Sequence, residues 1–269
     1  MSVDEVMAVL MAREIRDGDF ISHGASVPLA AAALMLARAT HAPTIDFFYQ
    51  GTVSTAETDP AKLMLDLDRI YRSAPAFFTQ AQIVDFSLRG NADFQFLRPA
   101  QIDRHGSVNT SLIGTLEEPR RRFHGIAIPD AMTVMRRICL YVTEHSPRVF
   151  PERLDFVTGV GHVDRDRWRE RLRVPGGGPS AVVTPLAVLD FETPERAMRL
   201  RELLPGVSVD DVVAATGFEL HVPDDVAEAE PPTPDELSKL REIDPLAIRQ
   251  LEFASLREGA RARLAAART

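Results

Sequence analysis

Residues 48–52 place a phenol, an amide and a glycine where a predicted strand ends. The segment Phe48-Tyr49-Gln50-Gly51-Thr52 closes an apolar run that is typical of a strand over residues 44–49. Open α/β sheets bind ligands at the carboxyl ends of their parallel strands, and Gly51 would permit a tight turn and close backbone approach. This segment is therefore one candidate site, although the same pattern also fits an ordinary strand exit.

A second polar cluster occupies residues 100–111. Asp103 and Gly106 suit a tight turn in which the glycine takes a positive φ. The amides of Gln101 and Asn109 flank that turn. They could bind a ligand through hydrogen bonds, or they could simply tie the turn together.

Several common catalytic patterns are missing from the sequence. The seven histidines are scattered without metal-ligand spacing, so no metal site is predicted. The segment 159–162 is too short for a dinucleotide fingerprint, which needs a third glycine opening a helix. Neither a phosphate-binding P-loop nor the Gly-x-Ser-x-Gly nucleophile elbow of hydrolases is present.

Composition indicates a globular protein that does not bind nucleic acid. The chain has 269 residues, of which 45% are hydrophobic and 26% charged, and its formal net charge is −8. No signal peptide is expected, and the longest apolar stretch, 27–37, is too short to span a membrane. The single cysteine, Cys139, lies in an apolar run and is predicted to be a buried strand residue, which fits a cytoplasmic setting.

The first fifty residues alternate between helix and strand signals. Ser2 and Glu5 form a capping box for a helix that ends near residue 17, and Pro28 opens a second, Ala-rich helix that runs to residue 38. Strands are predicted at 19–22 and 44–49, with a turn at 23–26. This alternation indicates an α/β fold with a parallel sheet.

The remaining elements are predicted from shorter patterns, and residues 1–269 are expected to form a single domain. The predicted elements are helices at 61–72, 81–88 and 208–216, strands at 93–97, 138–143 and 154–157, and a hairpin of 181–184 with 187–190. Residues 222–234 are acidic and Pro-rich, and two C-terminal helices follow that divide near Asp244-Pro245. Four arginines, Arg249, Arg257, Arg261 and Arg263, are expected on the solvated face of the last helix.

Motifs spread along almost the whole chain resemble, in their order, the B subunits of family I coenzyme A (CoA) transferases, particularly the glutaconate CoA-transferase branch. The matching segments are 13–19, Gly24 with Pro28-Leu29, 100–109, 123–125, 154–158, 205–212, 216–220 and 243–245. The resemblance implies a three-layer α/β/α sandwich with a mostly parallel open sheet. It also implies an A-type partner subunit, in a heterodimer or heterotetramer, with an active site between the subunits that accepts an acyl-CoA.

The same resemblance implies the usual chemistry and its groups. A glutamate carboxylate attacks the thioester, forms an acyl anhydride and then a glutamyl-CoA thioester. Coenzyme A enters as part of the substrate, and no permanently bound cofactor is expected. The positions expected to bind substrate or CoA are Gly24, Gly51, Gln101, Asn109 and Gly125.

Two departures from the family pattern bear on catalysis. The family's glutamate position falls on Tyr49, followed by Gln50, and a phenol with a pKa of about 10 does not provide an equivalent carboxylate cycle. Glu57, eight residues further on, could substitute only if its loop folds back. The segment after Gly125 lacks the family's glycines, and Pro129 removes an amide donor from it.

Three functions remain open. The first is the steroid-degradation ring-opening hydrolase related to these transferases, where the resemblance implies a catalytic glutamate on the A-type partner and a pocket lined by Tyr49 and Gln50. Phe47, Phe94 and Phe96 would suit its bulky acyl group or would simply pack the core. The second is orthodox CoA transfer between carboxylic acids, with Glu57 or a partner residue as nucleophile. The third is a non-catalytic scaffold for the A-type partner.

Overall fold

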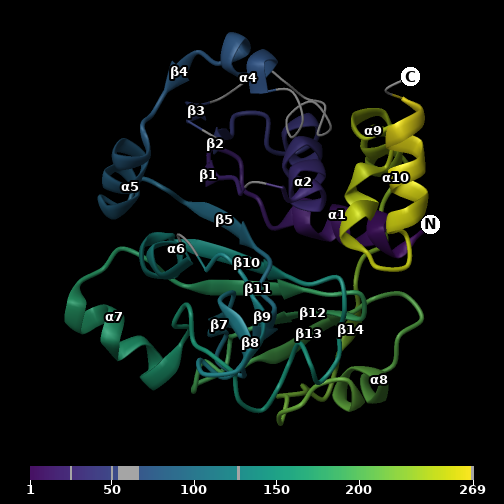
Figure 1. The fold of residues 1–269 in the computed structure, drawn as a ribbon. Helices are drawn as coiled ribbons and strands as arrows, with labels where there is room; N and C mark the ends of the chain where they lie inside the picture. Colours follow the sequence, from purple (N-terminus) through teal and green to yellow (C-terminus); the bar gives the residue numbers. More distant parts are fainter. Residues whose placement is uncertain (25, 50, 54–66, 126–127, 268–269) are drawn as a thin grey trace. The chain divides into compact units, whose positions relative to one another are not determined.

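The computed structural model describes the chain except for residues 25, 50, 54–66, 126–127 and 268–269 (Figure 1). The chain gathers into two compact units. Unit 1 consists of Met1–Phe86, Ala92–Phe96 and Pro231–Thr269, and unit 2 of Ser87–Asn91 and Leu97–Glu230. Each unit is assembled from segments that are separate in the sequence. The single domain expected over residues 1–269 stays a prediction.

Unit 1 is built on a mixed sheet with the strand order β5-β1-β2-β3-β4. Strand β1 pairs in parallel with both β2 and β5, whereas β3 pairs antiparallel with β2 and β4. Its strands are β1 (Phe20–Ser22), β2 (Asp46–Tyr49), β3 (Thr52–Val53), β4 (Ala76–Phe77) and β5 (Phe94–Leu97, of which Leu97 belongs to unit 2). Its helices are α1 (Val3–Arg13), α2 (Pro28–Ala39), α4 (Leu67–Ser73), α5 (Gln80–Leu88, ending in unit 2), α9 (Pro234–Ile243) and α10 (Arg257–Ala266), with a 3-10 helix η2 at Ile248–Glu252.

Helix α2 forms the core of unit 1. Every residue from Pro28 to Ala37 is buried, as expected for a helix that is apolar on all sides. The helix contacts α1, α9 and η2. Its first turn is satisfied by Glu252, whose carboxylate accepts a hydrogen bond of 2.8 Å from the Leu29 amide, where the helix dipole favours a negative charge.

A buried ion cluster joins the two ends of the chain within unit 1. Arg249 lies 2.8 Å from Asp4 of α1 and 3.0 Å from Asp244, and all three residues are buried. The expectation that Arg249 belongs to the solvated face of the last helix is therefore wrong. Arg249 lies in η2, and its charge is buried because two carboxylates compensate it.

Unit 2 contains strands with the order β14-β13-β12-β11-β10, which pair in both parallel and antiparallel fashion, and two small antiparallel hairpins. The sheet strands are β10 (Arg137–Tyr141), β11 (Pro179–Val183), β12 (Ala187–Asp190), β13 (Arg199–Leu203) and β14 (Ala227–Glu228). The small hairpins pair β6 (Gln101–Ile102) with β7 (Val108–Asn109) and β8 (Leu112–Gly114) with β9 (Pro119–Arg122). The helices are α6 (Ile128–Val134), a 3-10 helix η1 (Val163–Asp166), α7 (Arg167–Leu172) and α8 (Val209–Ala214).

Local sequence signals are confirmed where caps and turns set the structure. The capping boxes of Ser2 with Glu5, Ser208 with Asp211 and Thr233 with Glu236 are all present. Strands β11 and β12 form the predicted hairpin, and Cys139 is fully buried in β10.

The predicted strand at 154–157 does not form. The Asp155 amide instead donates to the side-chain oxygen of Gln101 at 3.1 Å, and the Asp155 carboxylate accepts the Gly114 amide at 2.8 Å. This segment therefore binds the small hairpins through side chains rather than through a strand ladder.

Candidate functional site

The carboxyl edge of strands β1 and β2 carries the first candidate site. Tyr49 is the last residue of β2, as predicted, and its side chain is buried. The chain turns back at once into β3, where the Thr52 hydroxyl donates a 2.6 Å hydrogen bond to the Tyr49 carbonyl. A buried phenol therefore stands where the parallel strands end.

Gly51 makes this turn possible. Its φ is +91°, a conformation that is strained for any residue with a side chain. A Cβ atom at this position would lie 3.4 Å from the Phe78 carbonyl oxygen and 3.6 Å from the Tyr71 hydroxyl. Gln50 and Glu57, the other two groups predicted here, lie outside the described residues.

His23 lies at the same edge and was not predicted as a site residue. Its backbone amide donates to the Phe48 carbonyl at 2.9 Å, and its ring centroid lies 5.3 Å from that of Tyr49. The imidazole is buried, and burial lowers its pKa to about 4. In the described part of the chain, neither ring nitrogen has a hydrogen-bond partner. The position of His23 directly after a predicted strand was a sequence signal, but its burial and missing partners were not.

Gly24 follows His23 in the connection to α2. A Cβ atom there would approach Val27 to 3.5 Å, an ordinary contact distance, so space does not demand a glycine. The aromatic residues proposed to hold an acyl group are buried, and Phe94 and Phe96 pack edge to face at 4.8 Å between ring centroids. In this structure they behave as core residues.

The second candidate site, around Gln101 and Asn109, is a closed polar network in unit 2. The Asn109 amide group donates to the Gln101 side-chain oxygen at 2.7 Å and to the Leu112 carbonyl at 2.6 Å. Its own oxygen accepts the amides of Ser111 and Leu112. These four bonds use the full hydrogen-bonding capacity of the Asn109 side chain, which is completely buried.

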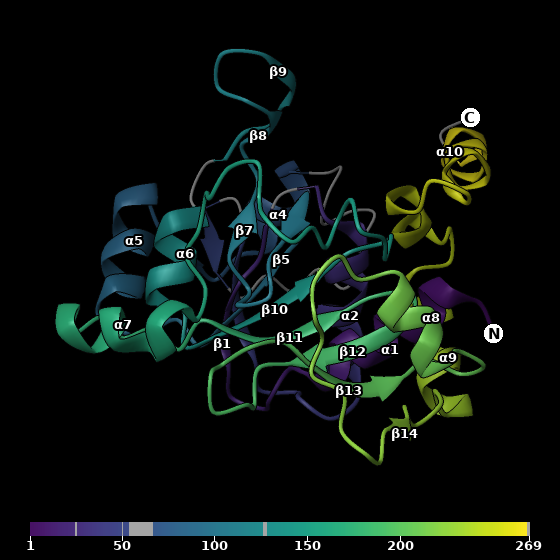
Figure 2. The same cartoon turned by 90° about the horizontal axis from the view of Figure 1, so that it is seen from below.

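The network holds the foot of the β8–β9 hairpin, which extends away from the strands of the unit 2 sheet in Figure 2. The Ser111 hydroxyl lies 2.7 Å from that of Thr158, and the Thr158 hydroxyl also accepts the Thr110 amide. Gly125 closes the foot with a φ of +60°, and a Cβ atom there would collide with the Ser111 hydroxyl oxygen at 2.6 Å. Gln101 and Asn109 thus position the hairpin here, and a direct role in substrate binding stays a prediction.

Asp103 and Gly106 form the predicted tight turn. The Asp103 carboxylate accepts the backbone amides of His105 and Ser107 at 2.9 and 2.8 Å, and Gly106 has a φ of +73°. The segment that follows Gly125 is helical from Ile128 onward. Pro129 lies in the first turn of α6, where a missing amide hydrogen removes no bond from the helix.

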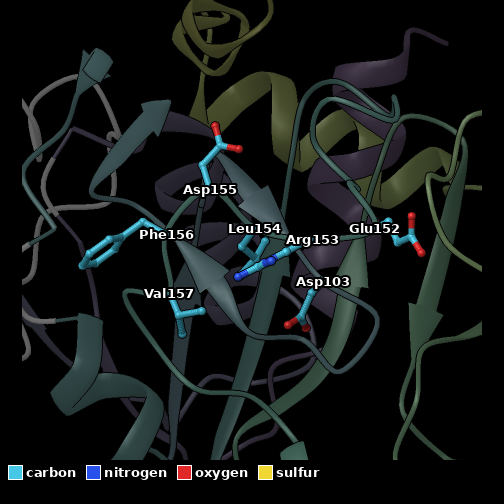
Figure 3. Close-up of a pocket in the computed structure, with 7 residues that line it drawn as sticks. All are labelled: Asp103, Glu152, Arg153, Leu154, Asp155, Phe156 and Val157. Carbon is cyan, nitrogen blue, oxygen red and sulfur yellow. The ribbon is translucent and has the colours of Figure 1, made fainter. Parts of the chain in front are cut away.

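One cavity of about 390 Å³ opens beside this turn in unit 2. Figure 3 shows its walls, which come from Asp103 and the irregular segment 152–157. Three of the lining side chains are carboxylates (Asp103, Glu152 and Asp155), and one is the cation Arg153. None of the predicted site residues that the structure describes lines this cavity.

The predicted residues therefore form two groups. Tyr49, Gly51 and Gly24 gather with His23 in unit 1, whereas Gln101, Asn109 and Gly125 belong to unit 2. Among residues with described positions, no group of His, Cys, Asp or Glu could hold a metal ion. No helix in the described part of the chain is long and apolar enough to cross a membrane.

Comparison with known proteins places this arrangement in a family. Residues 5–215 match the family described as coenzyme A transferase. The chain is 30% identical over 244 residues to the B subunit of 3-oxoadipate CoA-transferase from Pseudomonas knackmussii, covering 90% of this chain and 93% of that protein. It is 31% identical to the cholesterol ring-cleaving hydrolase IpdB subunit of Mycobacterium tuberculosis, covering 93% and 98%.

The fold agrees with these sequence matches. The crystal structure of glutaconate coenzyme A-transferase from Acidaminococcus fermentans superposes with a TM-score of 0.81 at 28% identity, covering 91% of this chain and 95% of that chain. The expected α/β fold of CoA-transferases is thereby confirmed. Because the family match spans most of the chain and the related subunits align over nearly their whole length, this chain belongs to the coenzyme A transferase family.

Proposed function

We propose that this chain is the B subunit of a two-subunit enzyme that acts on an acyl-CoA, and that it hydrolyses a carbon–carbon bond in a steroid-derived CoA thioester. The observation that carries the proposal is the buried phenol of Tyr49 at the carboxyl edge of β2, where the family's glutamate is expected. A phenol cannot form the anhydride and thioester intermediates of CoA transfer. The similarity to the IpdB subunit, a protein named for ring cleavage, favours the hydrolase.

The proposed reaction adds water to a ketone carbonyl of the acyl group. The bond between that carbonyl carbon and its neighbour breaks, the electron pair stays on the neighbour and a proton is added there. The products are a carboxylic acid and a C–H group, and CoA stays attached. Such cleavage needs a second carbonyl to stabilise the leaving carbanion, so the substrate class is a cyclic β-diketone CoA thioester. The general base is assigned to the A-type partner.

The second candidate is orthodox CoA transfer, favoured by the similarity to the B subunit of 3-oxoadipate CoA-transferase. In that case Glu57 or a partner residue would carry the acyl and CoA groups in turn. A non-catalytic scaffold role for the chain is the third possibility.

A labelled-water assay separates these functions. The chain is co-purified with its A-type partner and supplied with a cyclic β-diketone CoA thioester in ¹⁸O water. Hydrolysis predicts one ¹⁸O atom in the new carboxylate, CoA still esterified, and no turnover by either subunit alone. Exchange of CoA between succinyl-CoA and 3-oxoadipate, with a hydroxylamine-sensitive adduct on Glu57, would instead establish transfer.

Tyr49→Phe tests whether the phenol acts in the reaction. If its hydroxyl contacts substrate or water, kcat of the complex should fall by about 10- to 100-fold, because a positioned hydrogen bond is lost in the transition state. Tyr141→Phe is the matched control, since Tyr141 is also a buried tyrosine but lies in β10 of unit 2. Equal kcat in wild type and Tyr49→Phe would favour the scaffold role.

A further inference from the structure

The imidazole of His23 is a buried polar group inside unit 1. Both of its ring nitrogens are buried, and neither has a hydrogen-bond partner among the residues that the structure describes. Buried polar groups in folded proteins are nearly always paired, and an exception calls for a functional explanation or a bound molecule. The half-buried His145 and the buried His162 differ in this respect. His145 lies between the hydroxyls of Thr184 and Thr216, and His162 lies between Asp166 and the Pro179 carbonyl.

The backbone fixes where this imidazole lies. In the parallel pairing of β1 with β2, Ser22 is opposite Phe48, so the next residues along the two strands are His23 and Tyr49. The His23 amide donates to the Phe48 carbonyl, which extends the pairing one residue past β1. The two rings then meet at the carboxyl edge, 5.3 Å apart and tilted by 45°.

The environment keeps the ring neutral at physiological pH. Burial lowers the pKa of His23 to about 4, and no described carboxylate pairs with the ring to oppose this. A neutral imidazole offers one N–H donor and one nitrogen acceptor. It is a weak general base under these conditions, but it is a competent hydrogen-bond donor that brings no positive charge into the site.

We propose that His23 is a catalytic residue that donates its ring N–H to a carbonyl oxygen of the substrate's acyl group. In the proposed reaction this is the ketone oxygen that gains negative charge when water attacks the carbonyl carbon. The inference rests on the proposed action on acyl-CoA. A donor aimed at a developing oxyanion in a water-poor site stabilises the transition state more than the ground state. The ring nitrogens are covered in this structure, so binding requires that the ring turn or that the covering groups shift when substrate enters.

The test uses the complex with the A-type partner and three variants. His23→Leu removes both polar atoms, His23→Gln keeps a donor and an acceptor, and His145→Leu is the control because His145 is half-buried and both of its ring nitrogens are partnered. His23→Leu should lower kcat and kcat/KM together by about 100-fold or more with little change in KM. His23→Gln should recover at least part of this loss.

Thermal unfolding separates a catalytic role from a structural one, because the two roles predict opposite changes in the Tm of His23→Leu. Removing an unpartnered buried polar group relieves an unfavourable burial, so His23→Leu should keep or raise the Tm. His145→Leu should lower the Tm because it removes the hydrogen bonds of the ring with the Thr184 and Thr216 hydroxyls, while the folded complex keeps its kcat. Should His23→Leu fail to assemble, His23→Gln decides the question: a kcat below that of the wild type with an unchanged Tm supports the inference, and a lowered Tm contradicts it.

Two results would overturn the inference about His23 and leave the proposed function standing. One is an active complex in which His23→Leu retains the wild-type kcat and KM. The other is a drop in Tm for both His23 variants like that of His145→Leu, which would make the residue structural. A wild-type complex that neither binds nor turns over the β-diketone CoA thioester or succinyl-CoA would instead refute the proposed function, and the inference with it.

Discussion

At the residue scale, the buried polar side chains differ in whether they have hydrogen-bond or ion-pair partners. Asn109 and Arg249 are buried with partners, and both hold other segments in place. His23 is buried at the strand edge without a partner among the described residues. Full pairing is the mark of a structural polar group, because an unpaired one costs free energy. The contrast separates groups that stabilise the fold from a group available to a ligand.

Arg249 should be the most sensitive of these groups to mutation. Arg249→Met leaves Asp4 and Asp244 buried without their cation, so we expect a loss of about 3–5 kcal/mol in the free energy of unfolding. Urea denaturation of the complex measures it. The control is Arg261→Met, whose exposed pair with Glu258 should contribute less than about 1 kcal/mol. Comparable losses in both variants would contradict a special role for the buried cluster.

At the element scale, the β8–β9 hairpin depends on side chains at its foot rather than on a large sheet. Two short strands in isolation are marginally stable in water. Here the hairpin is held by Asn109, by the Ser111–Thr158 pair and by the Asp155 carboxylate on the Gly114 amide. The family resemblance predicts that Gln101 and Asn109 bind substrate or CoA. In the structure the side-chain amides of both residues hold the foot of the hairpin in place.

Asn109→Ala should loosen this hairpin. The substitution removes four hydrogen bonds from a fully buried position, and we expect a loss of about 2 kcal/mol or more. Trypsin should then cut faster at Arg120, Arg121 and Arg122, because local opening exposes the strand. Thr110→Val is the control, since the buried Thr110 hydroxyl has no hydrogen-bond partner in the described ranges. Unchanged cleavage in Asn109→Ala would show that the hairpin is anchored by other contacts.

At the scale of the whole chain, unit 1 brings the first helix, α1, into contact with helix α9 of the C-terminal segment. Glu5 of α1 accepts a 2.8 Å hydrogen bond from Arg241 of α9, and Arg13 pairs with Glu236. The hydrogen bond from Arg241, opposed by burial and aided by the Ser2 amide, lowers the pKa of Glu5 from 4.5 to about 2. Stability at low pH should therefore depend on this contact between the chain ends.

The sign of this dependence follows from the lowered pKa. Glu5 binds a proton more weakly in the folded chain than in the unfolded chain, so its contribution is complete above about pH 4.5 and is lost as the pH falls toward 2. Glu5→Gln should lower the urea midpoint at pH 7, and its difference from wild type should shrink below pH 4.5. Glu258→Gln, at an exposed site, is the control. A constant difference from pH 7 to pH 3 would contradict the assigned role.

Much of the fold could be predicted because its signals are local. The capping boxes at Ser2, Ser208 and Thr233, the proline at the start of α2 and the hairpin of β11 with β12 each depend on residues a few positions apart. The prediction of a strand at 154–157 was wrong because the contacts of this segment are distant in sequence. Its apolar residues suit a strand, but the Asp155 amide binds a side chain 54 positions away. The prediction of an exposed Arg249 was wrong for the same reason, since its ion-pair partner Asp4 lies at the other end of the chain.

The sequence by itself determined the family, the α/β character and the place of Tyr49 at the end of a strand. Ordered motifs and local periodicity carry that information. Only the tertiary structure decided that the side chains of Gln101 and Asn109 bind the foot of a hairpin. It also decided that His23 lies at the edge beside Tyr49 with both ring nitrogens unpaired among the described residues. Burial and hydrogen-bond pairing are properties of neighbours in space, and strand pairing brings residues 23 and 49 together although the whole of α2 separates them in sequence.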